Sequence, residues 1–240
     1  MYLYLALAPA LALALYVYWR DKYEKEPISE LVKCFVLGAL CCTPAGITNG
    51  IGAEVLGFDF FGENGLGVSF FMAFFVVGLG EELYKYLVLI FYAYRRPNFN
   101  EPFDGIVYGA MIGLGFAALE NVYYVMDGGV GVAFARMFTA VPMHASFAVL
   151  MGYQVGLSKF INSSVRTKVA LKGLFLAVFF HGAYDFFLFQ SSSVLLTLLV
   201  FPVMIWAMVL SRKAMRLHLE NSPFRKSEKP PSWNVRKITL

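Results

Sequence analysis

The stretch that decides the fold runs from residue 68 to residue 94, VSFFMAFFVVGLGEELYKYLVLIFYAY. As a helix it is long enough to cross a ~30 Å hydrocarbon layer. Three charged side chains, Glu81, Glu82 and Lys85, interrupt it near its middle. A charge at bilayer depth costs roughly 2.5–3.5 kcal/mol even on insertion scales, so such residues are typical of functional sites. The stretch therefore predicts a membrane helix that carries part of a polar site.

The composition of the whole chain agrees with this prediction. Of the 240 residues, 59% are hydrophobic and only 15% are charged, with a mean hydropathy of +0.63. A soluble domain carries about 25% charged residues. The apolar runs are continuous rather than alternating, which favours helices over a barrel. We expect an all-α, polytopic membrane protein with a polar cavity inside the bundle.

Seven membrane helices account for the pattern of apolar runs and charges. We expect them at about 2–19, 29–51, 68–94, 104–126, 132–156, 168–190 and 193–211. Apart from Lys85 and Arg136, which lie inside spans, every Lys and Arg falls on one predicted side. By the positive-inside rule, the N-terminus is then outside and the C-terminus cytoplasmic, as in a bacterial cell membrane. Topology thus explains the net charge of +4 without a nucleic-acid partner.

The chain divides into a membrane bundle, residues 1–211, and a basic cytoplasmic tail, residues 212–240. The tail is too polar to span a membrane. We expect it to be disordered or to lie on the anionic leaflet. No soluble domain is expected.

Polar side chains recur in four successive spans. Besides the three in span 68–94, they are Glu120, Asn121, Arg136, His144, His181 and Asp185. Glu81 and Lys85 are four residues apart, as are His181 and Asp185, so each pair shares a helix face. Counted from the outer ends of the spans, these groups lie in the middle or outer part of the bilayer. They predict one shared cavity that opens toward the outside.

Such a cavity has the chemistry of hydrolysis. Glu82, Glu120, His144 and His181 are of the types that bind zinc, and a second carboxylate would serve as general base. In a metal-free alternative, a buried glutamate activates water directly, and His181 or Asn121 steadies the oxyanion. Both alternatives use the same candidate catalytic residues: Glu81, Glu82, Lys85, Glu120, Asn121, His144, His181 and Asp185. Asp185 would orient the His181 ring.

Several of these residues also have a purely structural interpretation. The Glu81–Lys85 pair is consistent with a buried structural ion pair, and Glu120–Asn121 with a clamp between helices. Arg136, close to a span end, is expected to extend its side chain outward. Asp104 is expected to be a helix N-cap. The small residues Gly105, Gly109, Gly113 and Gly115 predict close helix packing.

Motifs on successive spans and in the first loop give a family resemblance. Glu81 to Lys85 matches EExxK, Phe116 to Asn121 matches FxxxEN, His181 to Asp185 matches HxxxD, and DKYEKEP follows the first span. Together with His144 in VPMHA, they resemble the PrsW family of intramembrane proteases over about residues 16–190. The resemblance implies a fold related to the CAAX prenyl endopeptidase and bacteriocin-processing group. It also implies a substrate like a membrane-anchored anti-sigma factor, cut near the extracytoplasmic side.

The resemblance and the residues lead to the same expectation, an intramembrane peptidase that acts on a membrane-anchored protein within the lipid bilayer. Glu120 stands where the CAAX-type enzymes carry a histidine, which leaves metal dependence open. Two other classes stay open. One is a proton-coupled transporter, although the sequence shows no internal repeat of the kind many transporters have. The other is a non-catalytic membrane sensor or immunity protein that keeps the fold.

Overall fold

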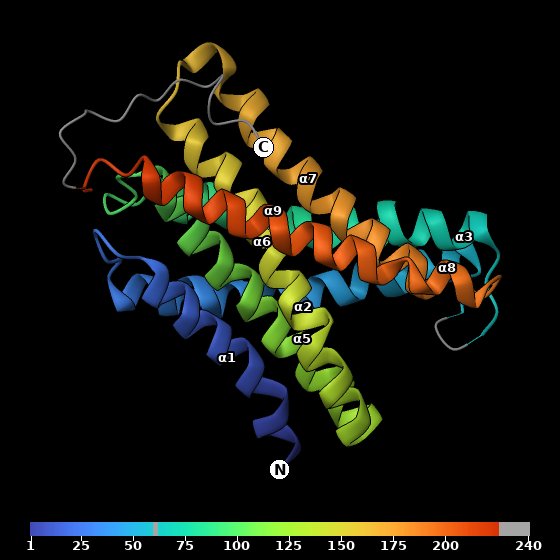
Figure 1. Cartoon of the computed structure of the whole chain (residues 1–240). Coiled ribbons are helices and arrows are strands. Elements are labelled where there is room, and N and C mark those ends of the chain that lie inside the picture. Colours follow the sequence, from blue (N-terminus) through green and yellow to red (C-terminus); the bar gives the residue numbers. More distant parts are fainter. Residues whose placement is uncertain (60–61, 226–240) are drawn as a thin grey trace.

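The fold is a helical bundle. A computed structural model describes residues 1–59 and 62–225 and shows no strand among them, which confirms the all-α prediction (Figure 1). Its elements are α1 (Tyr2–Arg20), α2 (Ile28–Leu56), α3 (Leu66–Phe71), the π-helix η1 (Met72–Gly78), α4 (Leu79–Phe91), the 3₁₀ turn η2 (Ala93–Arg95), α5 (Pro102–Phe138), α6 (Ala140–Lys159), α7 (Ser163–Phe189), α8 (Val194–Leu198) and α9 (Val200–Glu220).

Six helical stretches in the described part of the chain are long and apolar enough to cross a membrane. The predicted count of seven spans is therefore not confirmed. One of the six, residues 102–159, changes direction at Gly129. The φ angle of this glycine is 72°, which lies outside the range of an α-helix. Its two arms run antiparallel (Figure 1). These arms correspond to the two spans expected at 104–126 and 132–156.

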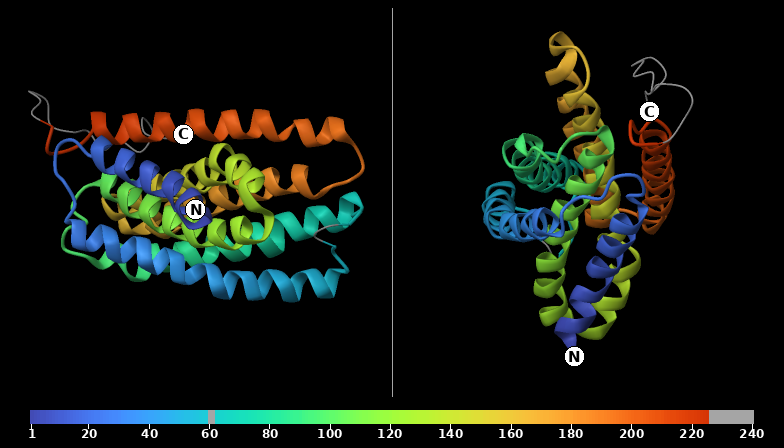
Figure 2. Two further views of the ribbon diagram at one scale, coloured as in Figure 1. Left: turned by 90° about the horizontal axis from the view of Figure 1, so that it is seen from below. Right: turned by 90° about the vertical axis from the view of Figure 1, so that its left-hand side faces the viewer.

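Helix α5 forms the centre of the bundle, between α2 and α9 (Figure 2). Its first half, from Pro102 to Ala118, is buried throughout. Glycines let its neighbours approach closely: a Cβ on Gly152 of α6 would lie 2.1 Å from the Gly105 carbonyl oxygen, and one on Gly115 would lie 1.9 Å from the Phe35 oxygen of α2. The close packing that we expected from the glycines of this segment is present.

The π-helix η1 lies immediately before the charged part of its span. It runs from Met72 to Gly78, three residues before Glu81. Small partners make room for this segment. A Cβ on Gly182 of α7 would lie 2.5 Å from Phe74, and one on Gly52 of α2 would lie 2.3 Å from Val76. π-Helical turns frequently accompany functional sites.

Loops and the N-terminus that the charge pattern places outside lie near one another in pairs. Tyr2 at the N-terminus lies next to the Gly129 bend, its hydroxyl 3.9 Å from a Cβ built on that glycine. The backbone N–H of Asn64 donates to Ser191 Oγ at 2.9 Å, which joins two other loops predicted to lie outside. Which group faces the cytoplasm stays a prediction.

Two expectations near the ends of helices were wrong. Helix α9 continues to Glu220, past residue 211, because Ala214, His218 and Leu219 on one side of it are buried against the bundle. His218 is fully buried and its Nδ1 bonds the Pro102 carbonyl at 3.0 Å. The beginning of the expected tail is thus a packed helix, and residues 226–240 lie outside the described residues.

The second correction concerns the start of α5. Glu101, not Asp104, is the N-cap, and Asp104 is the third residue of the helix. Asp104 Oδ2 accepts hydrogen bonds from the backbone N–H groups of Asn100 and Glu101, both at 2.7 Å. The two acids form a capping box, in which the acid three residues on bonds back to the cap.

Candidate active site

A cavity of about 390 Å³ lies among α2, α4, α5, α6 and α7. Five of the eight predicted catalytic residues line it: Glu81, Glu120, His144, His181 and Asp185. The other three, Glu82, Lys85 and Asn121, lie behind its wall and are almost completely buried. The structure thus brings side chains from four segments to one pocket and divides them into two layers.

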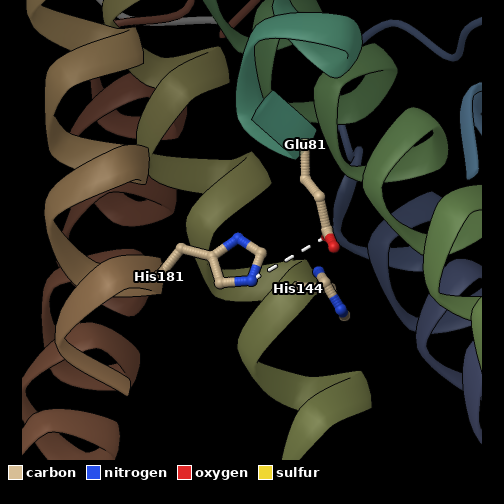
Figure 3. A group of neighbouring side chains, drawn as sticks. All are labelled: Glu81, His144 and His181. Carbon is tan, nitrogen blue, oxygen red and sulfur yellow. Dashed lines mark ion pairs between the residues drawn. The ribbon is translucent and has the colours of Figure 1, made fainter. Parts of the chain in front are cut away.

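Glu81, His144 and His181 form the centre of the cavity-facing layer (Figure 3). One ligand atom from each lies within 4.8 Å of the other two. Glu81 Oε2 lies 3.9 Å from His181 Nε2 and accepts no hydrogen bond from any described residue. Its other oxygen accepts one from Asn49 Nδ2 at 3.0 Å. Glu81 therefore keeps one oxygen available toward the two imidazoles.

His181 is held at both ring nitrogens. Its Nδ1 lies 2.8 Å from Glu82 Oε1, and its Nε2 lies 3.2 Å from Asp185 Oδ2. A carboxylate can only accept, so Nδ1–H donates to Glu82. A neutral ring then directs the Nε2 lone pair toward Asp185 and Glu81. Only a proton or a metal cation between these groups makes that arrangement favourable.

His144 bridges Lys85 and Glu120. Lys85 Nζ lies 3.1 Å from Nδ1, and Glu120 Oε2 lies 2.8 Å from Nε2. Because an ammonium group can only donate, Nδ1 accepts and Nε2–H donates to Glu120. A metal ion bound to His144 therefore competes with Lys85 for Nδ1 or with Glu120 for Nε2.

Lys85 is the buried cation of the site. We expected it to pair with Glu81, four residues before it, but it lies closer to Glu82, at 2.7 Å, than to Glu81, at 3.5 Å. Its ammonium group also lies 3.9 Å from the centre of the Phe116 ring. Phe116 of the FxxxEN motif thus supports the lysine through a cation–π contact.

Arg136 corrects one expectation. It does not extend outward: its Nη2 donates to Glu120 Oε2 at 2.5 Å, its Nε donates to Asn121 Oδ1 at 2.8 Å, and its side chain lines the cavity. Asn121 Nδ2 donates to the Ala6 carbonyl of α1 at 2.8 Å. Both ends of the Asn121 amide therefore have partners outside the cavity, and its role as an oxyanion donor stays a prediction.

Sequence reasoning missed two further residues of the cavity, Asn49 and Tyr124. Asn49 orients Glu81, and the Tyr124 ring lies 4.1 Å from the Arg136 guanidinium carbon. Asn49 could have been recognised from the sequence, because an amide inside the apolar run of span 29–51 needs a hydrogen-bond partner. Tyr124 could not have been recognised, because aromatic residues are common throughout these spans.

The site as a whole carries an excess of negative charge. Four carboxylates, Glu81, Glu82, Glu120 and Asp185, face two permanent cations, Lys85 and Arg136. Two protonated histidines or one divalent cation would balance the difference. Uncompensated charge at this depth is costly.

A family model described as PrsW family intramembrane metalloprotease matches residues 26–211. The chain belongs to the PrsW family. A relative named Protease PrsW from Bacillus subtilis (strain 168) is 35% identical over 191 residues, 80% of this chain and 84% of the relative. A relative of the same name from Oceanobacillus iheyensis is 35% identical over 82% of this chain and 87% of the relative. Another, from Geobacillus kaustophilus, is 37% identical over 72% of this chain and 73% of the relative.

Membership of the PrsW family confirms that the chain is an intramembrane protease and a multi-pass membrane protein. Its substrate is accordingly membrane-embedded, and lipid is its solvent. The transporter and the non-catalytic sensor are therefore set aside. No solved structure matched the chain.

Proposed function

We propose that Glu81, His144 and His181 hold one zinc ion with which the protein hydrolyses a peptide bond of a membrane-anchored substrate. Zinc bound by nitrogen and carboxylate ligands makes water acidic near neutral pH and polarises a carbonyl group. The observation that carries the proposal is the convergence of these three side chains, from α4, α6 and α7, on one buried cavity.

Three features of the site fit a zinc ion. The donors are two imidazoles and a carboxylate, a set that catalytic zinc sites use, and His144 would exchange its contact with Lys85 or with Glu120 for the ion. Glu81 Oε2 is buried and accepts no hydrogen bond, and its one cationic neighbour, Lys85 Nζ, lies 3.5 Å away, which leaves the oxygen free to bind a metal ion. The excess of two negative charges around the cavity matches the charge of one divalent ion.

The proposal changes the ligand set expected from the sequence. Glu82 is fully buried behind the cavity, where it accepts from Lys85 and from His181 Nδ1. It is therefore a positioning residue that directs Nε2 of His181 into the cavity, as acids behind metal-binding histidines do. Glu120 is engaged with Arg136 and His144 rather than free as a ligand.

Glu120 and Arg136 are the groups best placed to handle the proton and the substrate. The Glu120 side chain is 16% exposed and lines the cavity, so we assign it the role of general base that takes a proton from water. Arg136 fixes the Glu120 carboxylate and offers positive charge to the oxygen of the scissile carbonyl. Asp185 Oδ2 lies 3.2 Å from His181 Nε2, the nitrogen that would bind zinc, so Asp185 adds negative charge beside the ion rather than a hydrogen bond to the ring.

The site lies nearer to one end of the bundle. Along α5, Glu120 is about 14 Å from the Gly129 bend and about 24 Å from Asp104 near the other end, at 1.5 Å per residue. The bend lies on the side that the charge pattern places outside. We therefore propose a first cut near the extracytoplasmic side of a bacterial cell membrane, in a substrate of the anti-sigma-factor kind, with the N-terminus of the protease outside.

Cleavage by the purified protein tests the function. Glu81→Gln and His181→Gln should abolish cleavage of a membrane-anchored test substrate. Their controls are Glu54→Gln, an exposed acid on α2, and His218→Gln, a buried histidine outside the cavity, which should leave cleavage largely intact. Undiminished turnover in both site variants would refute the proposal.

A further inference from the structure

The DKYEKEP segment, residues 21–27, has no part in the site described above. It forms the loop between α1 and α2, at the left of Figure 1, next to the start of α5. Two of its acids, Glu24 and Glu26, lie beside Asp104 of α5. One carboxylate oxygen from each of the three lies within 4.8 Å of the other two.

Each of these three acids keeps one buried oxygen without a partner. They are Glu24 Oε2, Glu26 Oε1 and Asp104 Oδ1. The other oxygens of Glu26 and Asp104 are engaged: Tyr108 donates to Glu26, and two backbone N–H groups donate to Asp104. Glu26 is 2% exposed and Asp104 is 0% exposed, so water satisfies neither free oxygen easily. Buried polar atoms in native proteins almost always have a partner.

No positive side chain among the described residues supplies that partner. The two nearby ammonium groups bind carbonyl oxygens instead: Lys25 bonds Tyr18 and Asp21, and Lys159 bonds Tyr94. Two further acids, Asp21 and Glu101, flank the cluster, and each also has a buried oxygen without a partner. Five carboxyl groups therefore lie together, and no side chain of residues 1–59 or 62–225 forms an ion pair that balances them.

Burial without a counter-charge disfavours the ionised form of a carboxyl group. A divalent cation would favour the ionised forms and would supply a partner for the carboxylates of Glu24, Glu26 and Asp104 at once.

We propose that Glu24, Glu26 and Asp104 form a second cation site, which takes a hard divalent ion, Ca²⁺ or Mg²⁺, and joins the α1–α2 loop to α5. Oxygen-only ligand sets suit these ions, whereas zinc prefers nitrogen and sulfur. Glu24 is only half-buried, so the site is reachable from water. It is distinct from the candidate active site, because about 24 Å of α5 separates Asp104 from Glu120.

Thermal unfolding of the full-length protein in detergent tests this site. The protein is first stripped with a chelator and then titrated separately with Ca²⁺ and Mg²⁺. One of the two should raise Tm by roughly 5–10 °C when the free ion is about a hundredfold above Kd, as linkage predicts for a chain of this size. His181→Ala, which removes an active-site ligand, should show the same rise.

The matched variant is Glu24→Gln combined with Asp104→Asn. Amides keep the shape and the capping acceptor but remove repulsion, so this variant should fold and, without cations, unfold at or above the Tm of the stripped wild type. It should lose the cation-induced rise. No rise in the wild type with either ion would overturn the proposal and would indicate that protons alone neutralise the cluster. An equal rise in the double variant, or loss of the rise in His181→Ala, would also overturn it.

Discussion

Glu82→Gln, compared with Glu81→Gln, separates a residue that positions a ligand from the ligand itself. The two acids are adjacent in sequence, yet Glu81 faces the cavity and Glu82 lies behind it. In the structure, Glu82 Oε1 accepts from both Lys85 and His181. A glutamine oxygen can keep both contacts, so the fold should persist.

The magnitude follows from the loss of charge. A hydrogen bond to a charged acceptor contributes about 1.5–3 kcal/mol and one to a neutral acceptor about 1 kcal/mol. The weaker hydrogen bond to His181 therefore reduces the free energy of zinc binding by about 1–2 kcal/mol. Loss of a negative charge close to a divalent ion adds to this, which brings the expected fall in zinc affinity to about 10–100-fold. Glu81→Gln removes a ligand, and we expect this variant to bind no zinc under the same conditions.

The assay is zinc content against buffered free zinc, measured in parallel with peptide cleavage at saturating zinc. Glu82→Gln should bind a full equivalent at high free zinc and recover part of its activity there. Glu81→Gln should recover neither. If Glu82→Gln lost zinc as completely as Glu81→Gln, or if Glu81→Gln kept it, the assignment of the two glutamates would be wrong.

Three further predictions concern stability. Lys85→Met leaves Glu82 buried without its closest cation and should lower the free energy of unfolding by about 3–5 kcal/mol. Lys33→Met, at the exposed pair with Glu30, should change little; equal losses in a denaturant titration would refute the role of burial. Gly152→Ala places a Cβ 2.1 Å from the Gly105 oxygen and should cost about 1–3 kcal/mol. Gly131→Ala, with no atom within 4 Å, should cost nothing, and the same outcome for both would contradict the packing. Desolvation raises the pKa of Glu101 to about 7 from 4.5. Between these pH values the folded protein holds a proton that the unfolded chain has lost, so folding becomes less favourable as the pH rises. In the presence of a chelator, the free energy of unfolding of the wild type should therefore fall by about 1–3 kcal/mol relative to that of Glu101→Gln between pH 5 and pH 8. A stability difference that stays constant over this range would refute the shift.

The helices could be predicted because the membrane imposes a simple rule on the sequence. Long apolar runs must be helical, so the expected spans agree with the helices except where local packing intervenes. Helix α9 extends past its apolar core because His218 and its neighbours pack on α5, which hydropathy cannot detect. The change of direction at Gly129 falls in the gap expected between spans 104–126 and 132–156.

The site was predicted as a set of residues but not as two layers. Charges at bilayer depth identify candidates, and helical spacing places them on faces. Which of two adjacent glutamates faces the cavity depends on helix rotation, and the π-helical segment before Glu81 alters that rotation. The partners of Arg136 could not be predicted either, because they depend on the packing of the two arms of residues 102–159.

Elemental analysis of the wild-type protein, purified without chelator and coupled to an activity assay, tests the central claim most directly. The account predicts about one zinc per chain at this site, together with activity that a chelator removes and added zinc restores. Protein that contains no metal and cleaves its substrate undiminished in the presence of a chelator would contradict it. That result would assign the activation of water to a buried glutamate alone.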